Sequence, residues 1–452
     1  MVIDIGARRE LFVDDYLLDM LDGVRQQLNP PQRREVALEM TATAECATSA
    51  YYNLFEDDGR FRLYYRGNAP GDESPEQTVN YAESRDGIHF TRPVLNLVAF
   101  DGSTANHVVY QGVAGHNFHV FCDDNPACPP AQRYKAVGGE WEKLYGFASP
   151  DGYRWSKLQE TPLAVAGTFD SLNVAFWDAR LGQYRLFSRY FERATGARAI
   201  QSCTSEDFLH WTPPVPHVYL DDAGPEQYYT NATVPCPGAE HLLLSFPKRF
   251  VPERTRDITG ADYQYPSDGV SDAVFMSSRD GVHWRRFREA WVRPGLDDAN
   301  WTHRNNMVAW GIARTSPVEW SMYISEHYGW TSNRLRRLAI RPWGFAGVHA
   351  DYAGGSFTTH PLTFTGDTLR LNAATSAVGS LQVEVLDAAG APIPGFTRDE
   401  MAPWFGDDLD AVMRWTGGAD VGRMAGQPVR LRVYLQDADV YALRFGARHE
   451  TT

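Results

Sequence analysis

Ser278-Arg279-Asp280-Gly281-Val282-His283-Trp284 is one of four segments that repeat the same pattern along the chain. The other three are Ser84-Arg85-Asp86-Gly87-Ile88-His89-Phe90, Ser149-Pro150-Asp151-Gly152-Tyr153-Arg154-Trp155 and Ser205-Glu206-Asp207-Phe208-Leu209-His210-Trp211. Their serines lie 65, 56 and 73 residues apart, about the length of one four-stranded propeller blade with its loops. A repeat of this length indicates one supersecondary unit that is used several times.

The repeated segment has the composition of a hairpin turn. Asp-Gly supplies the positive φ angles that a tight turn demands, and the Asp and Ser side chains bond the turn's own backbone. The aromatic residue that closes each segment is placed to pack the returning strand between blades. We therefore assign the aspartates of these turns to architecture rather than to catalysis.

Alternating β-branched and aromatic runs fill the intervals between the repeats, whereas long amphipathic helical patterns are absent. These runs comprise residues 51–55, 61–66, 108–110, 134–137, 172–177, 183–190, 230–235, 242–246 and 273–277. After the fourth repeat, strand patterns at 307–314, 320–326 and 334–341 add one more blade. The sequence therefore predicts an all-β chain that begins with a five-bladed β-propeller.

The sequence pattern changes near Gly354. Residues 362–371, 380–387, 429–435 and 441–445 have the pattern of strands in a sandwich, and the Gly- and Pro-rich stretch 390–395 has that of a turn. We expect a propeller domain over residues 1–350 and a C-terminal β-sandwich over residues 351–452. The opening segment 11–18 is expected either to complete a blade or to tie the two domains together.

Composition disfavours several classes of partner. The formal net charge is -14 and the pI about 5.4, which disfavours nucleic acid and anionic membranes, because both reward clustered Lys and Arg. No apolar run approaches the roughly 18 to 20 residues of a membrane helix. Charged residues interrupt the first 15 positions, which therefore do not form a secretory signal. The expected location is cytoplasmic, or secreted if a signal segment has been removed.

Metal and nucleophile chemistry find little support in the sequence. The five cysteines are scattered and form no Cys-x-x-Cys pair, so buried thiols are expected, with a Cys122–Cys128 bridge as the alternative. His116 and His119 have a possible ligand spacing but no neighbouring acidic helix motif, so they are interpreted as loop histidines. We expect no metal site and no cofactor, and leave open a channel ion such as calcium.

The Ser-x-Asp-Gly-x-x-Trp turns, the five blades and the appended sandwich together resemble the furanosidase-type propeller hydrolases of glycoside hydrolase families 32, 43 and 68. Residues 11–17 (Leu-Phe-Val-Asp-Asp-Tyr-Leu), 275–281, 336–341 and 395–435 are similar to bacterial proteins labelled hypothetical family-32-type glycosyl hydrolases. This resemblance covers nearly the whole chain and implies a glycoside hydrolase with an oligo- or polysaccharide substrate. The invertase motifs Trp-Met-Asn-Asp-Pro-Asn-Gly, Arg-Asp-Pro and Glu-Cys do not occur in the corresponding blades, so fructosidase activity is not expected.

Glycoside cleavage needs a carboxylic acid to protonate the leaving oxygen and a carboxylate to act as nucleophile or base, roughly 5 to 10 Å apart. In a propeller, the first residues of the innermost strands line the central funnel. Asp170 precedes the apolar run 172–177, and the resemblance places it where the aspartate of Arg-Asp-Pro lies. Glu226 precedes the next inner strand beside two tyrosines, which suits it to acid/base duty.

Two further carboxylates are taken as the equivalents in other blades and complete the catalytic candidates. They are Asp123, in the blade before Asp170, and Asp272, ahead of the run 273–277, with Asp14 and Asp15 as weaker candidates. The alternative for each is an ordinary turn carboxylate that bonds its own backbone.

Substrate contacts are expected from polar and aromatic groups at the same rim, because amides and guanidinium groups bond vicinal hydroxyls and aromatic rings stack on sugars. The candidates are Asn106, His107, Tyr229, Asn231, Trp301, Arg304 and Asn305. The leading functional hypothesis is a glycosidase or transglycosidase acting on a furanoside or another glycan. The alternatives are a non-catalytic carbohydrate-binding propeller, which needs no converging acids, and a partner-binding propeller, which needs a large exposed apolar patch.

Overall fold

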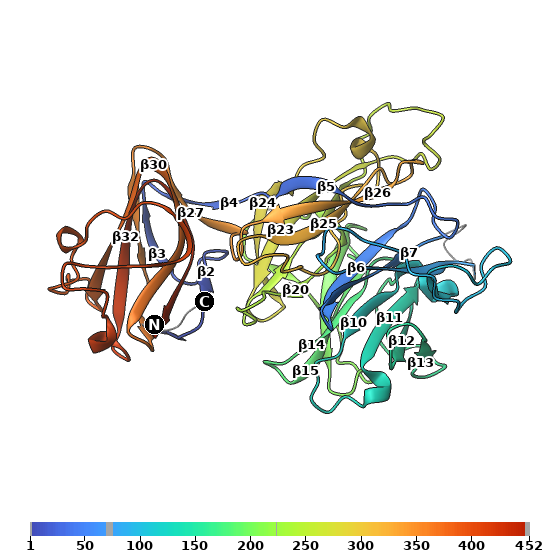
Figure 1. The fold of residues 1–452 in the computed structure, drawn as a ribbon, viewed down its shortest axis with the longest axis horizontal. Helices are drawn as coiled ribbons and strands as arrows, with labels where there is room; N and C mark the ends of the chain where they lie inside the picture. The colour runs from blue at the N-terminus through green and yellow to red at the C-terminus, as the bar shows by residue number, and fades with distance from the viewer. Residues whose placement is uncertain (1, 69–75, 223, 448–452) are drawn as a thin grey trace. The chain divides into compact units, whose positions relative to one another are not determined.

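The computed structural model describes residues 2–68, 76–222 and 224–447 and is nearly all-β (Figure 1). The chain divides into two compact units, one formed by the residues up to Pro30 together with those from Arg341 onward, the other by Pro31–Ile340. This division places the first thirty residues with the C-terminal unit, whereas the sequence predicts a propeller over residues 1–350. All five cysteines are free thiols.

The unit formed by residues 31–340 has a propeller-like arrangement in which four blades are recognised. Three are four-stranded antiparallel sheets. They are β6 (Ala50–Asp57), β7 (Arg60–Arg66), β8 (Thr78–Ser84), β9 (Val108–Gln111); β10 (His119–Cys122), β11 (Tyr134–Glu140), β12 (Lys143–Ser149), β13 (Ser156–Lys157); and β14 (Val174–Asp178), β15 (Gln183–Phe191), β16 (Arg198–Ser205), β17 (Val215–Pro216).

The fourth blade is a larger, seven-stranded sheet, and a three-stranded sheet follows it. The larger sheet contains β18 (Val218–Tyr219), β19 (Gln227–Thr230), β20 (Val234–Pro235), β21 (Leu243–Ser245), β22 (Lys248–Val251), β23 (Val270–Ser278) and β24 (His283–Val292). The smaller one joins β25 (Trp320–Glu326) and β26 (Arg334–Ile340) to β5 (Gln32–Glu39). Segments from opposite ends of this unit thus lie side by side, with blue β5 along orange β26 in Figure 1.

The four repeated turns have the structural role that the sequence predicts. In the first, Gly87 N donates to Ser84 Oγ (2.9 Å), and His89 N donates to Asp86 Oδ1 (2.9 Å). The other three turns repeat these bonds, with Phe208 taking the glycine position at a φ of 68°. The turn carbonyls also bond a neighbouring blade, as where Tyr64 Oη donates to the Gly152 oxygen (3.0 Å). The side chains of these aspartates therefore serve to hold the turns in shape.

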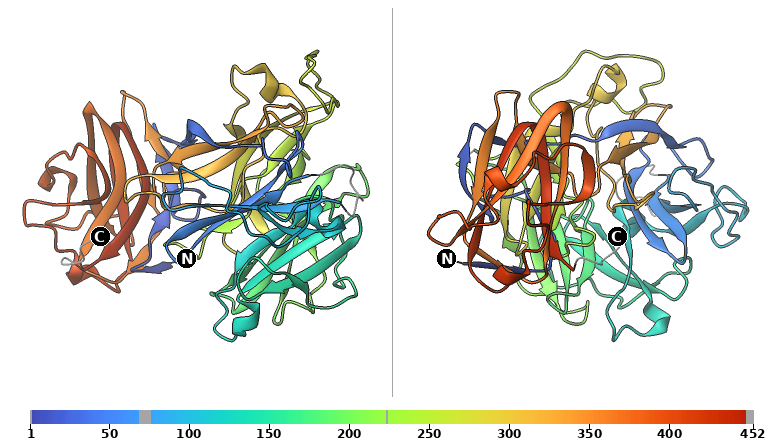
Figure 2. Two further views of the ribbon diagram at one scale, coloured as in Figure 1. Left: turned by 45° about the vertical axis from the view of Figure 1, so that its right-hand side comes forward. Right: turned by 60° about the vertical axis from the view of Figure 1, so that its left-hand side comes forward.

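The other unit is one ten-stranded sheet around its own core of aliphatic and aromatic residues. Its strands are β1 (Ile3–Gly6), β2 (Glu10–Leu11), β3 (Leu18–Asp22), β4 (Arg25–Leu28), β27 (Ala346–Ala350), β28 (Gly355–Thr359), β29 (Leu362–Phe364), β30 (Thr368–Asp387), β31 (Asp407–Val412) and β32 (Val429–Gly446). Figure 2 shows the first strands, in blue, beside the orange and red strands that they pair with. Because β2 pairs with β32, segment 11–18 belongs to this unit and completes no blade.

Five short 3-10 helices complete the elements of the described residues. They are η1 (Val113–Asn117), η2 (Pro130–Gln132), η3 (Asp298–Trp301), η4 (Arg398–Glu400) and η5 (Gly422–Met424). None of the helices described here is long and apolar enough to cross a membrane.

Candidate functional site

Side chains at or near the starts of the inner strands converge in the 31–340 unit. Tyr51 is the second residue of β6, His116 lies in η1 ahead of β10, and Asp170 precedes β14. The Tyr51 and His116 rings lie 5.6 Å apart, and Tyr51 Oη donates to the Asp170 carbonyl oxygen (3.5 Å). With their neighbours they form what we call the axial cluster, which consists of Tyr51, Arg66, His116, Asp170, Arg189, Arg198, Tyr229, Lys248, Arg304 and Tyr328.

Tyr229, in β19, is the aromatic centre of this cluster. Four cations from four segments face its ring, at distances to the ring centroid that range from 3.8 to 5.6 Å. They are Lys248 Nζ (3.8 Å) and the guanidinium carbons of Arg189 (5.2 Å), Arg198 (5.4 Å) and Arg304 (5.6 Å). Each contact falls in the range of a cation–π interaction, so the ring partly offsets the mutual repulsion of these charges.

Arg66, the last residue of β7, contacts the Tyr51, His116 and Tyr328 side chains of the cluster. Its guanidinium donates to the Thr48 carbonyl oxygen and to Tyr328 Oη (3.1 Å), lies 3.2 Å from His116 Nε2 and covers the Tyr51 ring at 4.8 Å. These partners are all uncharged groups. Arg66 therefore brings a full positive charge into the cluster without a carboxylate of its own among these contacts.

Asp170 is the predicted catalytic residue that the structure places in the axial cluster. Its carboxylate pairs with the buried Arg189 guanidinium, and its side chain stays 24% exposed, so a ligand can reach it. Tyr229 and Arg304, two of the predicted substrate contacts, belong to the same cluster. Placing candidates at the starts of inner strands was the reasoning that found these three residues.

The electrostatics of the cluster follow from burial among cations. Burial, followed by the charges of Arg304, Arg198, Arg189 and Arg66, holds the pKa of Lys248 well below its usual range. Burial and the charge of Arg66 likewise lower the pKa of His116, and burial lowers the pKa of Arg198. His303, beside Arg304, has a pKa lowered to about 3 by burial and by that charge.

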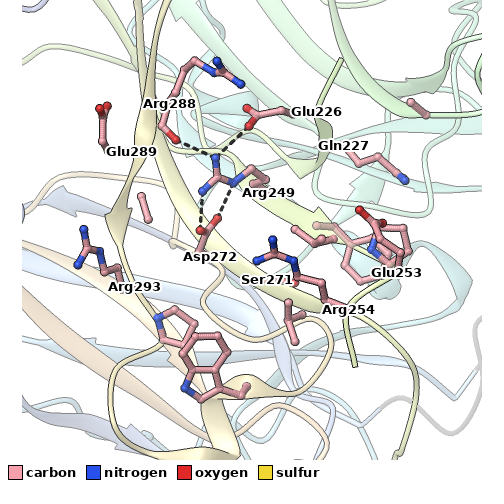
Figure 3. A pocket seen from close by; sticks show the side chains of 18 of the residues that line it. Glu226, Gln227, Arg249, Glu253, Arg254, Ser271, Asp272, Arg288, Glu289 and Arg293 are labelled. Carbon is pink, nitrogen blue, oxygen red and sulfur yellow. Dashed lines mark hydrogen bonds and ion pairs between the residues drawn. The ribbon is translucent and has the colours of Figure 1, made fainter. Parts of the chain in front are cut away.

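Glu226 and Asp272 lie in a second region, a cavity of about 850 Å³ (Figure 3). Arg249 lies between the two carboxylates: its Nη1 contacts Glu226 Oε1 (2.9 Å), and its Nε and Nη2 form a fork on Asp272 (2.9 and 2.6 Å). Trp301, another predicted substrate contact, lines this cavity, and its Nε1 donates to the Gly295 oxygen (2.8 Å). The cavity thus combines four acids, a tryptophan and four arginines.

Strand alternation explains why Glu226 is held apart from Asp170. Successive side chains of a strand point to opposite faces. In β19, Tyr228 Oη donates to Glu226 Oε2 (2.6 Å) and accepts from Arg286 (3.1 Å), whereas the adjacent Tyr229 faces the axial cations. Glu226 therefore shares the face of Tyr228, and its partners differ from those of Asp170.

Asp123 follows β10 and is held in a buried ion pair with Lys135. Its carboxylate also accepts from Tyr184 Oη (2.7 Å), and Asn125 N donates to its other oxygen (3.0 Å). Asp178, at the end of β14, is paired in the same way with Arg185 (2.6 Å). The carboxylates at this end of the inner strands are linked to cations of the adjoining strands, which favours the structural alternative for Asp123.

The remaining predicted contacts are bound to the protein itself. The amide groups of Asn106, Asn231 and Asn305 bond nearby backbone: Asn106 spans the Val98 and Ser103 oxygens, Asn231 accepts from Thr233 N, and Asn305 accepts from Tyr328 N. His107 is buried, with Nε2 3.5 Å from Glu45 Oε1 and 3.1 Å from the Asn80 amide. These four side chains hold loops and strand starts in place.

Sequence reasoning missed most of the cations of the axial cluster. Arg66, Arg189 and Lys248 stand within or at the ends of apolar strand patterns, and a charged side chain in such a run is a signal for a buried polar site. Among the described residues, no group of three or more His, Cys, Asp or Glu side chains is arranged to hold a metal ion.

No protein-family profile and no curated protein matches the chain. Among solved structures it is similar to an N-acetylgalactosamine deacetylase from F. plautii in complex with blood group B trisaccharide (12% identity, TM-score 0.43, 72% of this chain and 95% of that one). A glycosyl hydrolase from Bacteroides ovatus aligns at 14% identity (TM-score 0.44, 70% and 94%). A third similar structure is described as follows: the GH130 family of mannoside phosphorylases contains glycoside hydrolases that target β-1,2 mannosidic linkages in Candida mannan. It aligns at 16% identity with a TM-score of 0.39, over 75% of this chain and 97% of that one. At these values, the similarities decide neither the fold nor the activity of this chain.

Proposed function

We propose that the 31–340 unit is a five-bladed β-propeller. Segment 307–313 supplies an inner strand to the three-stranded sheet, because Val308 bridges Ile324 and Ala313 bridges Ser321. Bonds between the inner strands then close a ring. They are Val120 N to Asn53 Oδ1 (2.8 Å), Ala175 N to His119 Nδ1 (3.4 Å), Ser171 Oγ to the Tyr229 oxygen (2.6 Å), Trp310 Nε1 to the Thr233 oxygen (2.8 Å) and Leu54 N to the Trp310 oxygen (2.8 Å).

We propose that the other unit is a β-sandwich. Its two longest strands, β30 and β32, pair along most of their length, and their register shifts between Thr375 and Ser380. Such a shift lets long strands bend from one layer into another. The buried core then lies between the two layers, as a sandwich requires.

We propose that the protein is a glycoside hydrolase whose substrate occupies the axial cluster and whose catalytic carboxylate is Asp170. The observation that supports this most is the convergence of an accessible carboxylate, guanidinium groups and tyrosines from the starts of several inner strands. Tyr51 and Arg304 hold positive φ angles of 56° and 59°. Such backbone costs roughly 1–3 kcal/mol per residue and concentrates at functional sites.

The chemistry requires a carboxylate next to the sugar and a proton donor for the leaving oxygen. Asp170, paired with Arg189, suits the role of nucleophile or base, because the guanidinium holds the carboxylate in one orientation. Arg198 and Arg304, which are half-buried, supply hydrogen-bond donors for sugar hydroxyls, and the buried Tyr51, Tyr229 and Tyr328 line the site behind them. Glu226 and Asp272 retain a role in the proposal only if the 850 Å³ cavity, rather than the axial cluster, binds the glycan.

A non-catalytic carbohydrate-binding protein is the second candidate. It is favoured by the pairing of each predicted acid with a cation: Asp170 with Arg189, Asp123 with Lys135, and both Glu226 and Asp272 with Arg249. A binding protein needs such oriented groups but no second acid near Asp170.

Hydrolysis assays with aryl glycosides and glycan mixtures separate these candidates. We expect Asp170→Asn to lower kcat by about 10²- to 10⁴-fold and the matched variant Glu226→Gln to leave kcat nearly unchanged. If Glu226→Gln or Asp272→Asn abolishes turnover while Asp170→Asn does not, the active site is the 850 Å³ cavity. Glycan binding without turnover in the wild type supports the second candidate.

A further inference from the structure

The axial cluster is a concentration of positive charge in an acidic protein. The chain carries a formal net charge of -14, yet Arg66, Arg189, Arg198, Lys248 and Arg304 gather around a single tyrosine ring and its neighbours. The contacts of the cluster include one carboxylate among the described residues, that of Asp170. Charges of one sign in a low-dielectric site repel one another, so the arrangement is unfavourable unless it serves an anion.

Most of these cations have uncharged partners. Arg198 Nη1 donates to Gln227 Oε1 (2.8 Å), Arg304 Nη1 donates to Tyr328 Oη (3.4 Å), and Arg66 bonds a carbonyl, a phenol and a histidine ring. The Nε atoms of Arg66, Arg189 and Arg198 are buried and have no hydrogen-bond partner in the described part of the chain. Guanidinium groups with donors to spare are the usual partners of carboxylate and phosphate oxygens.

Lys248 provides a second, independent indication. Its side chain is fully buried beneath Tyr229, and its Nζ has no hydrogen-bond partner among residues 2–68, 76–222 and 224–447. Burial without a partner makes the protonated ammonium costly, and the pKa of Lys248 is therefore held well below its usual range. A negative charge held above the ring would offset that cost.

Partial exposure identifies the side of the cluster that a ligand reaches. Asp170, Arg198 and Arg304 are only half-buried, whereas Arg66, Arg189, Tyr229 and Lys248 are buried. The half-buried residues therefore form the rim of the cluster, and the buried basic side chains add to the positive electrostatic potential at that rim. In the 850 Å³ cavity, by contrast, Glu226 and Asp272 both pair with Arg249, and the lining holds as many carboxylates as arginines.

We propose that the axial cluster binds an oxyanion, either the acidic group of a glycan or a free inorganic anion, with Arg198 and Arg304 as its direct ligands. This inference rests on the proposed function only in taking the axial cluster as the substrate site. If a glycan brings the anion, the substrate is an acidic sugar that carries a carboxylate, sulfate or phosphate group. Arg189, which already holds Asp170, is left to position that carboxylate.

The test is calorimetric titration of the intact protein with glucuronate, galacturonate, galactose 6-sulfate, their neutral parents glucose and galactose, inorganic phosphate and sulfate. We expect acidic sugars to bind at least about tenfold more tightly than the neutral parents, and Arg304→Met and Arg198→Met to weaken that binding by about tenfold or more. Lys143→Met, which removes an exposed lysine at the start of β12, is the matched control and leaves binding unchanged. Tighter binding of phosphate or sulfate than of any acidic sugar assigns the site to a free anion.

Equal affinity for acidic and neutral sugars, with no inorganic anion bound, would overturn the inference, as would wild-type anion affinity in both folded arginine variants. Thermal unfolding of each variant shows whether it is folded. Should both fail to fold, Arg198→Lys and Arg304→Lys replace them, because a lysine keeps the positive charge but loses the guanidinium fork that holds an oxyanion. Binding is measured without turnover, so anion binding without hydrolysis refutes only the glycosidase, and hydrolysis of neutral glycans without anion binding refutes only this inference.

Discussion

His217 offers a quantitative test of the packing between two blades. Its ring stacks on Trp284 with centroids 4.8 Å apart and meets the edge of Phe187 at 5.8 Å. Both ring nitrogens are buried without a hydrogen-bond partner in the described residues. Burial lowers the pKa of His217 to about 3, against the slight opposing effect of Asp280. The ring thus acts as a neutral aromatic group that has two unmet polar atoms.

The sign of the pH dependence follows from proton uptake. In the unfolded chain this histidine titrates near pH 6.5, so below that pH the unfolded state binds a proton that the folded state does not take up until about pH 3. The stabilising contribution of the neutral ring is therefore complete above pH 6.5 and is lost as the pH falls. Integrated from pH 7 to pH 5, the loss is about 2 kcal/mol in the free energy of unfolding.

His217→Phe keeps the stacked ring and removes the titration. We expect the variant to be as stable as the wild type at pH 7, or more stable by about 1–3 kcal/mol because two unmet polar atoms disappear. At pH 5 its advantage grows by about a further 2 kcal/mol. Urea unfolding at the two pH values measures both quantities, and the other buried histidines cancel because both proteins contain them.

His119→Phe is the matched comparison, because burial also lowers the pKa of His119 to about 3. Here Nδ1 accepts a bond from Ala175 N (3.4 Å), so the variant gains the same resistance to acid but loses stability at pH 7. A difference between wild type and His217→Phe that is the same at pH 7 and pH 5 would refute the reasoning, since it would mean that the folded ring takes up its proton as readily as the unfolded one.

Two further predictions concern the architecture. Lys135→Met leaves the Asp123 carboxylate buried without its cation, so we expect the free energy of unfolding, measured in urea, to fall by about 3–5 kcal/mol. Adding Asp123→Asn to the same chain should restore part of this loss, and anion binding by the folded protein should be unchanged. Gly311→Ala would place a Cβ 1.9 Å from the Leu54 carbonyl oxygen at a φ of +109°, so we expect the free energy of unfolding to fall by more than about 2 kcal/mol. For the matched variant Gly182→Ala, whose Cβ meets nothing within 4 Å, we expect a fall of about 1 kcal/mol. A thermal unfolding midpoint of Gly311→Ala equal to that of Gly182→Ala would contradict the close packing of segment 307–313 on β6.

The turns and the starts of the inner strands were predictable because their chemistry is local. Asp86 and Gly87 define a hairpin by their own backbone preferences, and Asp170 precedes a run that only an inner strand explains. The grouping of β1 to β4 with the C-terminal unit was not predictable, since it depends on pairing with strands more than three hundred residues away. The alternating pattern of a strand indicates that it pairs, but not which strand it pairs with.

The separation of Glu226 from Asp170 has the same origin at a finer scale. Spacing along the repeat placed the two carboxylates at equivalent starts of neighbouring blades, and that spacing does bring β19 to the axis, where Tyr229 meets Arg189. Alternation then decides which residue of the strand faces inward, and a shift of one position turns Glu226 and Tyr228 toward Arg249 and Arg286. The pairing of β19 with β22 has one irregularity, between Tyr228 and Thr230, which lies beyond Glu226. This pairing sets Lys248 opposite Thr230, with its Nζ 3.8 Å from the centroid of the Tyr229 ring, so the strand that turns Glu226 away from the axis also brings Lys248 to it.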